Sequence, residues 1–121
     1  MKKLDDIEIA ELYIGKQYST EKLLEVAYPN RENEYLACNA DFSKEQMDLF
    51  GITPLLHEKW GYYGVDFTVF IHVDNDTIKD CYIYKARESF RCGRSRTTCL
   101  EPTQQEIRIF RRIMDYVTAC V

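Results

Sequence analysis

Residues Gly61–Arg87 read GYYGVDFTVFIHVDNDTIKDCYIYKAR, and this stretch predicts an antiparallel β-hairpin. In the first arm, apolar or aromatic residues fill the odd positions and mostly polar ones the even positions, which is the period of a half-buried strand. Asp74-Asn75-Asp76-Thr77 has the residue types of a tight turn, and Ile78–Arg87 follows as a second β-rich arm. The sequence therefore predicts a fold centred on a hairpin of about residues 61–87.

Two helices are predicted near the N-terminus. Asp5–Ile14 carries a helical stripe of apolar residues, and Gly15 is suited to end that helix. Ser19 or Thr20 can cap the start of a second helix, which must stop before Pro29 because the residue preceding a proline avoids the helical region.

The segment before the hairpin combines a loop, a strand and a third helix. Asn30–Asn33 is predicted as a polar loop and Glu34–Ala40 as a strand. Ser43 and Gln46 have the spacing of a capping box, in which each side chain satisfies the other residue's free amide. Gly51 is suited to end the short helix that follows.

The strongest helix signal lies at the C-terminus, where Thr103 and Glu106 form a second capping box directly after Pro102. Apolar residues share one side of this helix: Ile107, Phe110, Ile113, Met114, Val117 and Val121. Charged residues share the other side: Arg108, Arg111, Arg112 and Asp115. The chain is thus expected to be α+β, with N-terminal helices and a C-terminal helix packed on an antiparallel sheet.

Length and composition predict one compact domain over residues 1–121. Hydrophobic residues make up 45% of the chain, enough for a core without disulfides or metals, so disorder is not expected. No apolar run approaches the roughly 18 residues of a membrane span, and the start MKKLDD lacks the apolar stretch of a secretory signal. We therefore expect a cytoplasmic protein with no membrane partner.

The chain has five cysteines, at positions Cys38, Cys81, Cys92, Cys99 and Cys120. Their odd number and spacing match neither a disulfide framework nor a zinc site, so no metal and no cofactor are expected. Cys92 among arginines, with His72 as a base, is the one candidate for nucleophilic catalysis. A lone cysteine and a lone histidine are a weak signature, and we expect no catalytic residue and no enzyme activity.

One stretch has a local resemblance to a known family. Val73–Asp80, an aromatic strand and then Cys92-Gly93 resemble the hairpin-to-cysteine region of iron–sulfur cluster scaffold proteins, over roughly twenty residues. In that family a helix of small residues follows the cysteine, whereas this chain has Arg94–Thr98. We do not assign the chain to that family, and a metal-cluster scaffold or cysteine-based enzyme stands as the second alternative function.

Charge is distributed unevenly along the chain, whose net charge is −4. Residues 1–76 carry a net charge of −8 and residues 77–121 a net charge of +4. The basic half includes Arg87–Arg96, where Arg91, Arg94 and Arg96 alternate with hydroxyl residues that suit phosphate or carboxylate groups. An anion- or nucleic-acid-binding module is therefore the first alternative, although the acidic whole disfavours nucleic acid.

Aromatic residues around the hairpin point to a binding surface. Trp60, Tyr62, Tyr82 and Tyr84 lie in or beside it, and such side chains offer large contact area at low entropic cost. The leading prediction is a small acidic, non-catalytic protein-binding module whose main partner is another protein. Its acidity suggests an inhibitor or regulator of a nucleic-acid-handling enzyme, and the sequence leaves the oligomeric state open.

Overall fold

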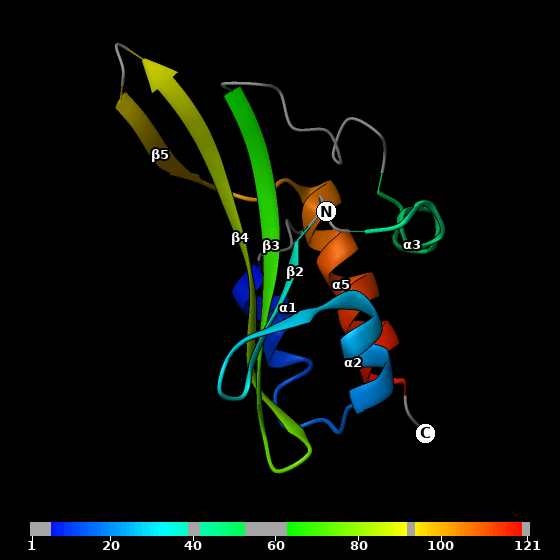
Figure 1. Ribbon diagram of the computed structural model, residues 1–121. Coiled ribbons are helices and arrows are strands. Elements are labelled where there is room, and N and C mark those ends of the chain that lie inside the picture. The colour runs from blue at the N-terminus through cyan, green and yellow to red at the C-terminus, as the bar shows by residue number, and fades with distance from the viewer. Residues whose placement is uncertain (1–5, 39–41, 53–62, 92–93, 120–121) are drawn as a thin grey trace.

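The computed structural model describes residues 6–38, 42–52, 63–91 and 94–119, and side chains within 8–38, 42–52, 67–85 and 101–119. It confirms the α+β fold, with the long hairpin at the centre of the sheet (Figure 1). The elements, in chain order, are α1 (Asp6–Glu11), α2 (Thr20–Val26), β1 (Tyr28–Arg31), β2 (Glu34–Cys38), α3 (Lys44–Phe50), β3 (Tyr63–Asp74), β4 (Thr77–Arg91), β5 (Arg94–Leu100) and α5 (Gln104–Thr118).

The sheet has five strands in the order β1-β2-β3-β4-β5, and every neighbouring pair is antiparallel. The predicted hairpin forms its centre, with Asp74 opposite Thr77 and a two-residue turn between them. Both turn residues, Asn75 and Asp76, have positive φ, the backbone geometry that matches the twist of paired strands.

A bulge interrupts the hairpin close to its turn. Val73 pairs with Ile78, but the next residue back, His72, pairs with Asp80, so Lys79 is an extra residue in β4. The Asp80 side chain accepts a hydrogen bond from the Cys81 amide at 2.9 Å, beside the irregularity. The extra residue places Cys81 and Ile83 on the inner face of the sheet and Tyr82 and Tyr84 on the outer face.

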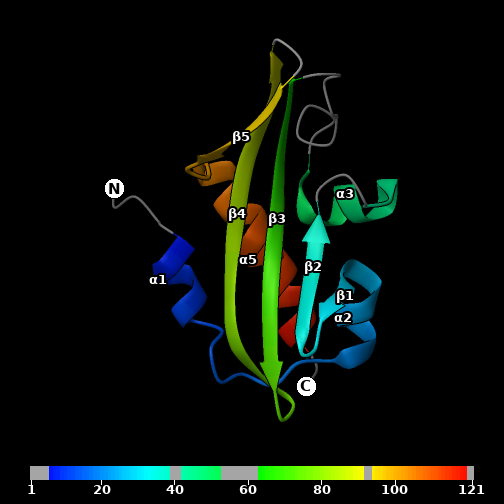
Figure 2. The ribbon, with the colours of Figure 1, turned by 60° about the vertical axis from the view of Figure 1, so that its left-hand side comes forward.

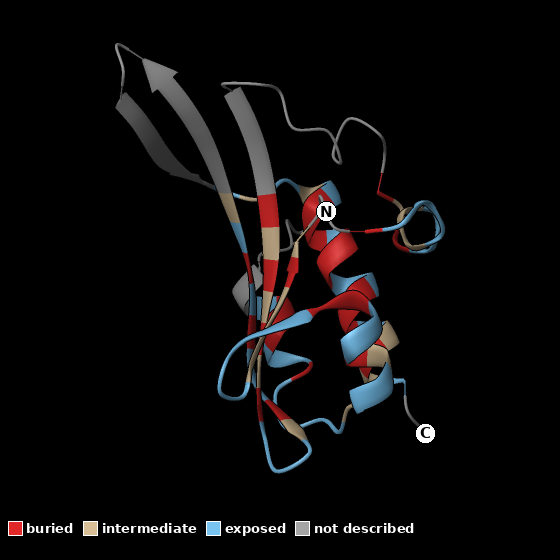
Figure 3. Ribbon diagram, viewed as in Figure 1, coloured by how far each residue is buried: buried red, intermediate tan, exposed pale blue. Residues whose placement is uncertain are grey.

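The helices lie on the inner face, as the two views in Figure 1 and Figure 2 agree. α5 crosses this face, and the apolar side predicted for it is buried from Ile107 to Val117, as Figure 3 shows in red, while Val121 lies outside the described residues. Tyr13, just after α1, donates a hydrogen bond to the Asp115 carboxylate of α5 at 2.6 Å. On the strand side, Phe67, Val69 and Ile71 are at most 1% exposed. None of the described helices combines the length and apolarity that a membrane crossing requires.

The buried layer contains one ion pair that the sequence pattern did not predict. Glu106 of α5 is 1% exposed, and its carboxylate accepts hydrogen bonds from Lys85 Nζ and the Thr103 amide, both at 2.8 Å. Because the carboxylate is paired with Lys85 and also completes the capping box, these contacts compensate the free-energy cost of burying its charge.

The predicted caps of the shorter helices are confirmed. Ser19 accepts from the Lys22 amide at the start of α2, and Ser43 and Gln46 form the capping box of α3. Helix α1 is shorter than expected: it ends at Glu11, and Gly15 lies beyond it with its N–H bonded to the Ile78 carbonyl rather than ending the helix.

Strand structure extends into two further segments. Residues 30 and 31, expected in a polar loop, belong to β1, and only Glu32-Asn33 remain as the turn to β2. The polar, arginine-bearing segment after residue 87, for which the sequence predicted no strand, extends β4 to Arg91 and forms β5. Sheet hydrogen bonding to an existing strand compensates the weak strand pattern of both segments.

Candidate functional site

The outer face of the sheet carries a row of large side chains across four strands. Successive backbone pairings join Tyr28 of β1 to Leu36 of β2, Leu36 to Phe70 of β3, and Phe70 to Tyr82 of β4. Directly paired residues of an antiparallel sheet share a face, so this row, with Tyr84 of β4, forms one surface. We call Tyr28, Leu36, Phe70, Tyr82 and Tyr84 the aromatic face.

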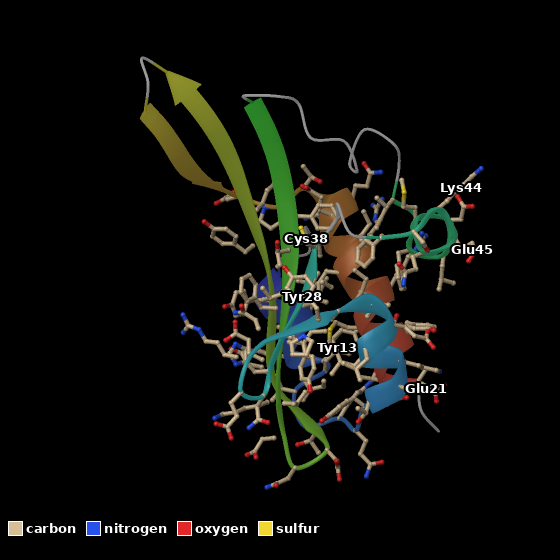
Figure 4. The ribbon with its side chains drawn as sticks, in the orientation of Figure 1. Tyr13, Glu21, Tyr28, Cys38, Lys44 and Glu45 are labelled. Carbon is tan, nitrogen blue, oxygen red and sulfur yellow. The ribbon has the colours of Figure 1, made fainter. Side chains whose placement is uncertain are left out.

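No described helix lies over the aromatic face. In Figure 2, β2, β3 and β4 pass in front of α5, and the other labelled helices lie to the sides. Tyr28, Tyr82 and Tyr84 are 45%, 37% and 38% exposed, whereas Phe70 is half-buried among them. Figure 4 shows Tyr28 and Cys38 beside the strands, while Lys44 and Glu45 project from α3 on the opposite side of the molecule.

The rings of the aromatic face hold one another in place. Phe70 stacks on Tyr82 with centroids 4.8 Å apart and planes 11° apart, and meets Tyr84 edge-on at 6.3 Å. His72 stacks more loosely on Tyr82, with ring centroids 6.4 Å apart. Rings fixed in this way lose little further freedom on binding, so the face is pre-organised.

Carboxylates border the aromatic face at one end. Glu34 and Asp80 pair in the backbone register with His72, one on each side, and Glu34 Oε2 lies 3.8 Å from His72 Nε2. Partial burial, followed by the charges of Glu34 and Asp80, raises the pKa of the Tyr82 hydroxyl. The surface thus offers flat apolar rings beside negative charge.

The predicted site residues fall into two separate groups. Tyr82 and Tyr84 are on the aromatic face, while Trp60 and Tyr62 lie outside the described residues. The backbone pairs Arg91 with Arg94 at the β4–β5 turn and Arg96 with Ser89. Arg91 lies nine positions beyond Tyr82 along β4, roughly 30 Å at about 3.3 Å per residue. The structure therefore does not bring the tyrosines and arginines together.

The cysteines give no sign of a metal site in the part of the chain described. Cys38 and Cys81 are not in disulfides, and no group of three or more potential metal ligands occurs among the described residues. Cys92 lies outside those residues, and Cys99 belongs to β5. The segment after Cys92 forms a strand instead of a helix, a further departure from the iron–sulfur scaffold proteins.

Sequence reasoning missed several members of the aromatic face. Phe70 occupies one of the even, mostly polar positions of the hairpin's first arm, so the pattern did not select it. Tyr28 and Leu36 belong to a pair of strands of which only the second was predicted. The available signal was Pro29 after Tyr28, because a proline within a strand is typical of a sheet edge. Comparison with protein-family models, curated proteins and solved structures finds no match to this chain.

Proposed function

We propose that the protein is a non-catalytic binding module and that the aromatic face docks another protein. One observation carries the proposal: the stacked cluster of Phe70, Tyr82 and Tyr84 lies on a sheet face that no described helix covers. Tyrosine and other aromatic side chains are enriched among the few residues that dominate binding energy. The hydroxyl groups of the tyrosines let this surface remain hydrated before the partner binds.

The charge beside the aromatic face favours a basic partner. Glu34 and Asp80 border the rings, and the chain as a whole has a net charge of −4. Complementary charge speeds association and excludes partners of the same sign. Nucleic-acid-handling enzymes present basic surfaces of this kind, and a protein that covers such a surface acts as their inhibitor or regulator.

The test is affinity capture of proteins from the source cell by three forms of the full chain. The wild type, the double variant Tyr82→Ala/Tyr84→Ala and the control Leu49→Ala are compared at equal loading. Leu49 is a matched control because it is 56% exposed but belongs to α3, away from the aromatic face. Circular dichroism checks that all three are folded.

The proposal predicts that the wild type and Leu49→Ala capture one or more proteins that the double variant does not capture. Once such a protein is purified, titration should show that the double variant binds it at least about thirtyfold more weakly than the wild type does. This corresponds to a loss of about 2 kcal/mol or more of binding free energy. Capture that is equal in all three forms would contradict the proposal.

The alternative function, binding of nucleic acid or another anion by the arginine segment, has one observation in its favour. The β4–β5 register sets Arg91 opposite Arg94, with Arg96 two residues further along β5. The triple variant Arg91→Ala/Arg94→Ala/Arg96→Ala, titrated with DNA and RNA at low and physiological salt, tests it. Tight binding by the wild type that weakens steeply with salt and disappears in the triple variant would favour this alternative.

A further inference from the structure

A cavity of about 300 Å³ lies on the helical side of the molecule, between α5 and the end of α3. Its lining consists of Gly51, Gln105, Arg108, Ile109 and Arg112. The four α5 residues follow the spacing i, i+3, i+4 and i+7, so they form one stripe along the helix. The cavity is independent of the aromatic face, which lies on the other side of the sheet.

Gly51 makes room for one of the two guanidinium groups. It ends α3 in the left-handed conformation with φ of 75°, and a Cβ at this position would clash with Arg112 Nη1. The guanidinium therefore lies against the backbone at the C-terminal end of α3, where the carbonyl groups give partial negative charge. This contact places the cationic group at the wall of the cavity.

Neither arginine of the cavity wall belongs to an ion pair within the described part of the chain. The ion pairs there are His72–Glu34 and Lys85–Glu106. Like charges one helical turn apart repel each other. An anion placed between them removes this repulsion and supplies the missing acceptors.

The lining matches one class of ligand. Guanidinium groups bind phosphate and carboxylate through forked pairs of N–H donors, and the amide of Gln105 adds a neutral donor. Ile109, which is 2% exposed, gives the cavity an apolar wall. The volume is at the lower end of the range for small-molecule sites, larger than a single small ion requires.

We propose that this cavity is a binding site for a phosphate group, held by Arg108 and Arg112. The phosphate is either free or carried by a small molecule or a phosphorylated side chain, because the recognised chemistry is the same. The site is separate from the proposed protein-binding function, and either can fail without the other.

The experiment titrates the full chain with inorganic phosphate, phosphoserine and adenosine monophosphate, using amide chemical shifts and the thermal midpoint as readouts. We expect shifts centred on Gly51 and Gln105 and a rise in midpoint, because a ligand that binds the folded state stabilises it. Phosphoserine or the nucleotide binding more tightly than inorganic phosphate would identify a carried phosphate. Equal affinity for the three ligands would identify free phosphate as the ligand of the site.

The decisive comparison uses two variants that each replace arginine with alanine on α5. Arg108→Ala/Arg112→Ala should weaken phosphate binding by about tenfold or more, because it removes the charge-assisted hydrogen bonds of both guanidinium groups. Arg111→Ala is the control, because Arg111 is exposed on the same helix but does not line the cavity. An equal response of the wild type and the double variant, or an equal loss in Arg111→Ala, overturns the proposal.

Two further variants separate charge from geometry. Gly51→Ala keeps every charge but displaces the Arg112 guanidinium, so it should weaken phosphate binding. The double lysine variant, Arg108→Lys/Arg112→Lys, retains both charges and loses only the forked pairs of N–H donors. Unchanged binding in Gly51→Ala, in a sample whose circular dichroism is that of the wild type, contradicts the assigned role of Arg112. Circular dichroism also checks that the lysine and alanine variants are folded.

Discussion

The two faces of the β3–β4 hairpin are built from alternate residues of the same strands, yet they have different environments. On the inner face, Phe67 and Ile83 are 1% and 4% exposed and lie in the same core as α5. On the outer face, Tyr82 and Tyr84 remain more than a third exposed. The sheet therefore has one face that stabilises the fold and one that is accessible to a partner.

The difference shows that stability and binding are separable in this molecule. Each fully buried large apolar side chain contributes about 1.5–3 kcal/mol, and the inner face holds most of those in the hairpin. The rings of the outer face contact mainly one another and the solvent, so their loss affects the fold less. Four measurements test this separation, in order of decreasing expected effect.

The sharpest comparison truncates two phenylalanines three residues apart on β3. Phe67→Ala should lower the free energy of unfolding by about 3–5 kcal/mol, because it leaves a cavity against α5 in the closed core. Phe70→Ala, on the outer face, should cost about 1 kcal/mol. Urea denaturation measures both. Similar losses for the two variants would mean that the faces do not differ in energetic role.

The polar contact of the inner face gives the second comparison. Lys85→Ala removes the partner of Glu106, whose side chain is 1% exposed, and should cost about 3 kcal/mol. Lys79→Ala removes an exposed lysine of the same strand and should change stability by less than about 0.5 kcal/mol. Chemical denaturation at pH 7 separates the two. A small loss for Lys85→Ala would show that solvent reaches Glu106.

Alkaline pH should weaken the inner face through Cys81. Burial, with a smaller effect of the Asp80 charge, raises the pKa of this thiol to about 12. The unfolded chain releases the proton near pH 8.5 and the folded protein only near 12, so the stabilisation is complete below the first value and lost as pH rises through the second. Between these two pH values, the release of one proton on unfolding lowers the free energy of unfolding by about 1.4 kcal/mol per pH unit.

The measurement is the free energy of unfolding of the wild type and Cys81→Ala from pH 8 to pH 11. The free energy of unfolding should fall more steeply with pH in the wild type than in Cys81→Ala. The difference in slope corresponds to the release of one proton, because the variant lacks the titrating thiol. Ile83→Val also alters the inner face but removes no titrating group, so its curve should run parallel to the wild type. Parallel curves for Cys81→Ala and the wild type would contradict the burial of the thiol.

The smallest effect is expected from deletion of Lys79, the extra residue of the bulge. Without it, regular pairing from the Asn75-Asp76 turn still sets Phe70 opposite Tyr82. Stability should therefore change by less than about 1 kcal/mol, and Tyr82 and Tyr84 should remain open to nitration by tetranitromethane. Protection of these tyrosines in the deletion variant would show that the strand has shifted by one residue.

Much of the fold could be predicted because its signals are local. The capping residues Ser19, Ser43 and Thr103 each act within three positions, and the apolar stripe of α5 repeats within one helix. The alternation of β3 likewise needs no information from elsewhere in the chain. The extent of β4, the existence of β5 and the burial of Glu106 depend instead on partners distant in sequence, so the local pattern did not indicate them.

For the candidate site, the sequence by itself determined that Tyr82 and Tyr84 share a face opposite to Cys81 and Ile83, because side chains alternate along a strand. It did not determine which face is buried. Regular pairing from the Asn75-Asp76 turn would set Tyr82 opposite Val69 and direct both tyrosines into the core. The bulge at Lys79 moves the register by one residue, and the helices close over Cys81 and Ile83 instead. Only the tertiary structure decided this outcome, because the choice depends on which set of side chains the helices cover.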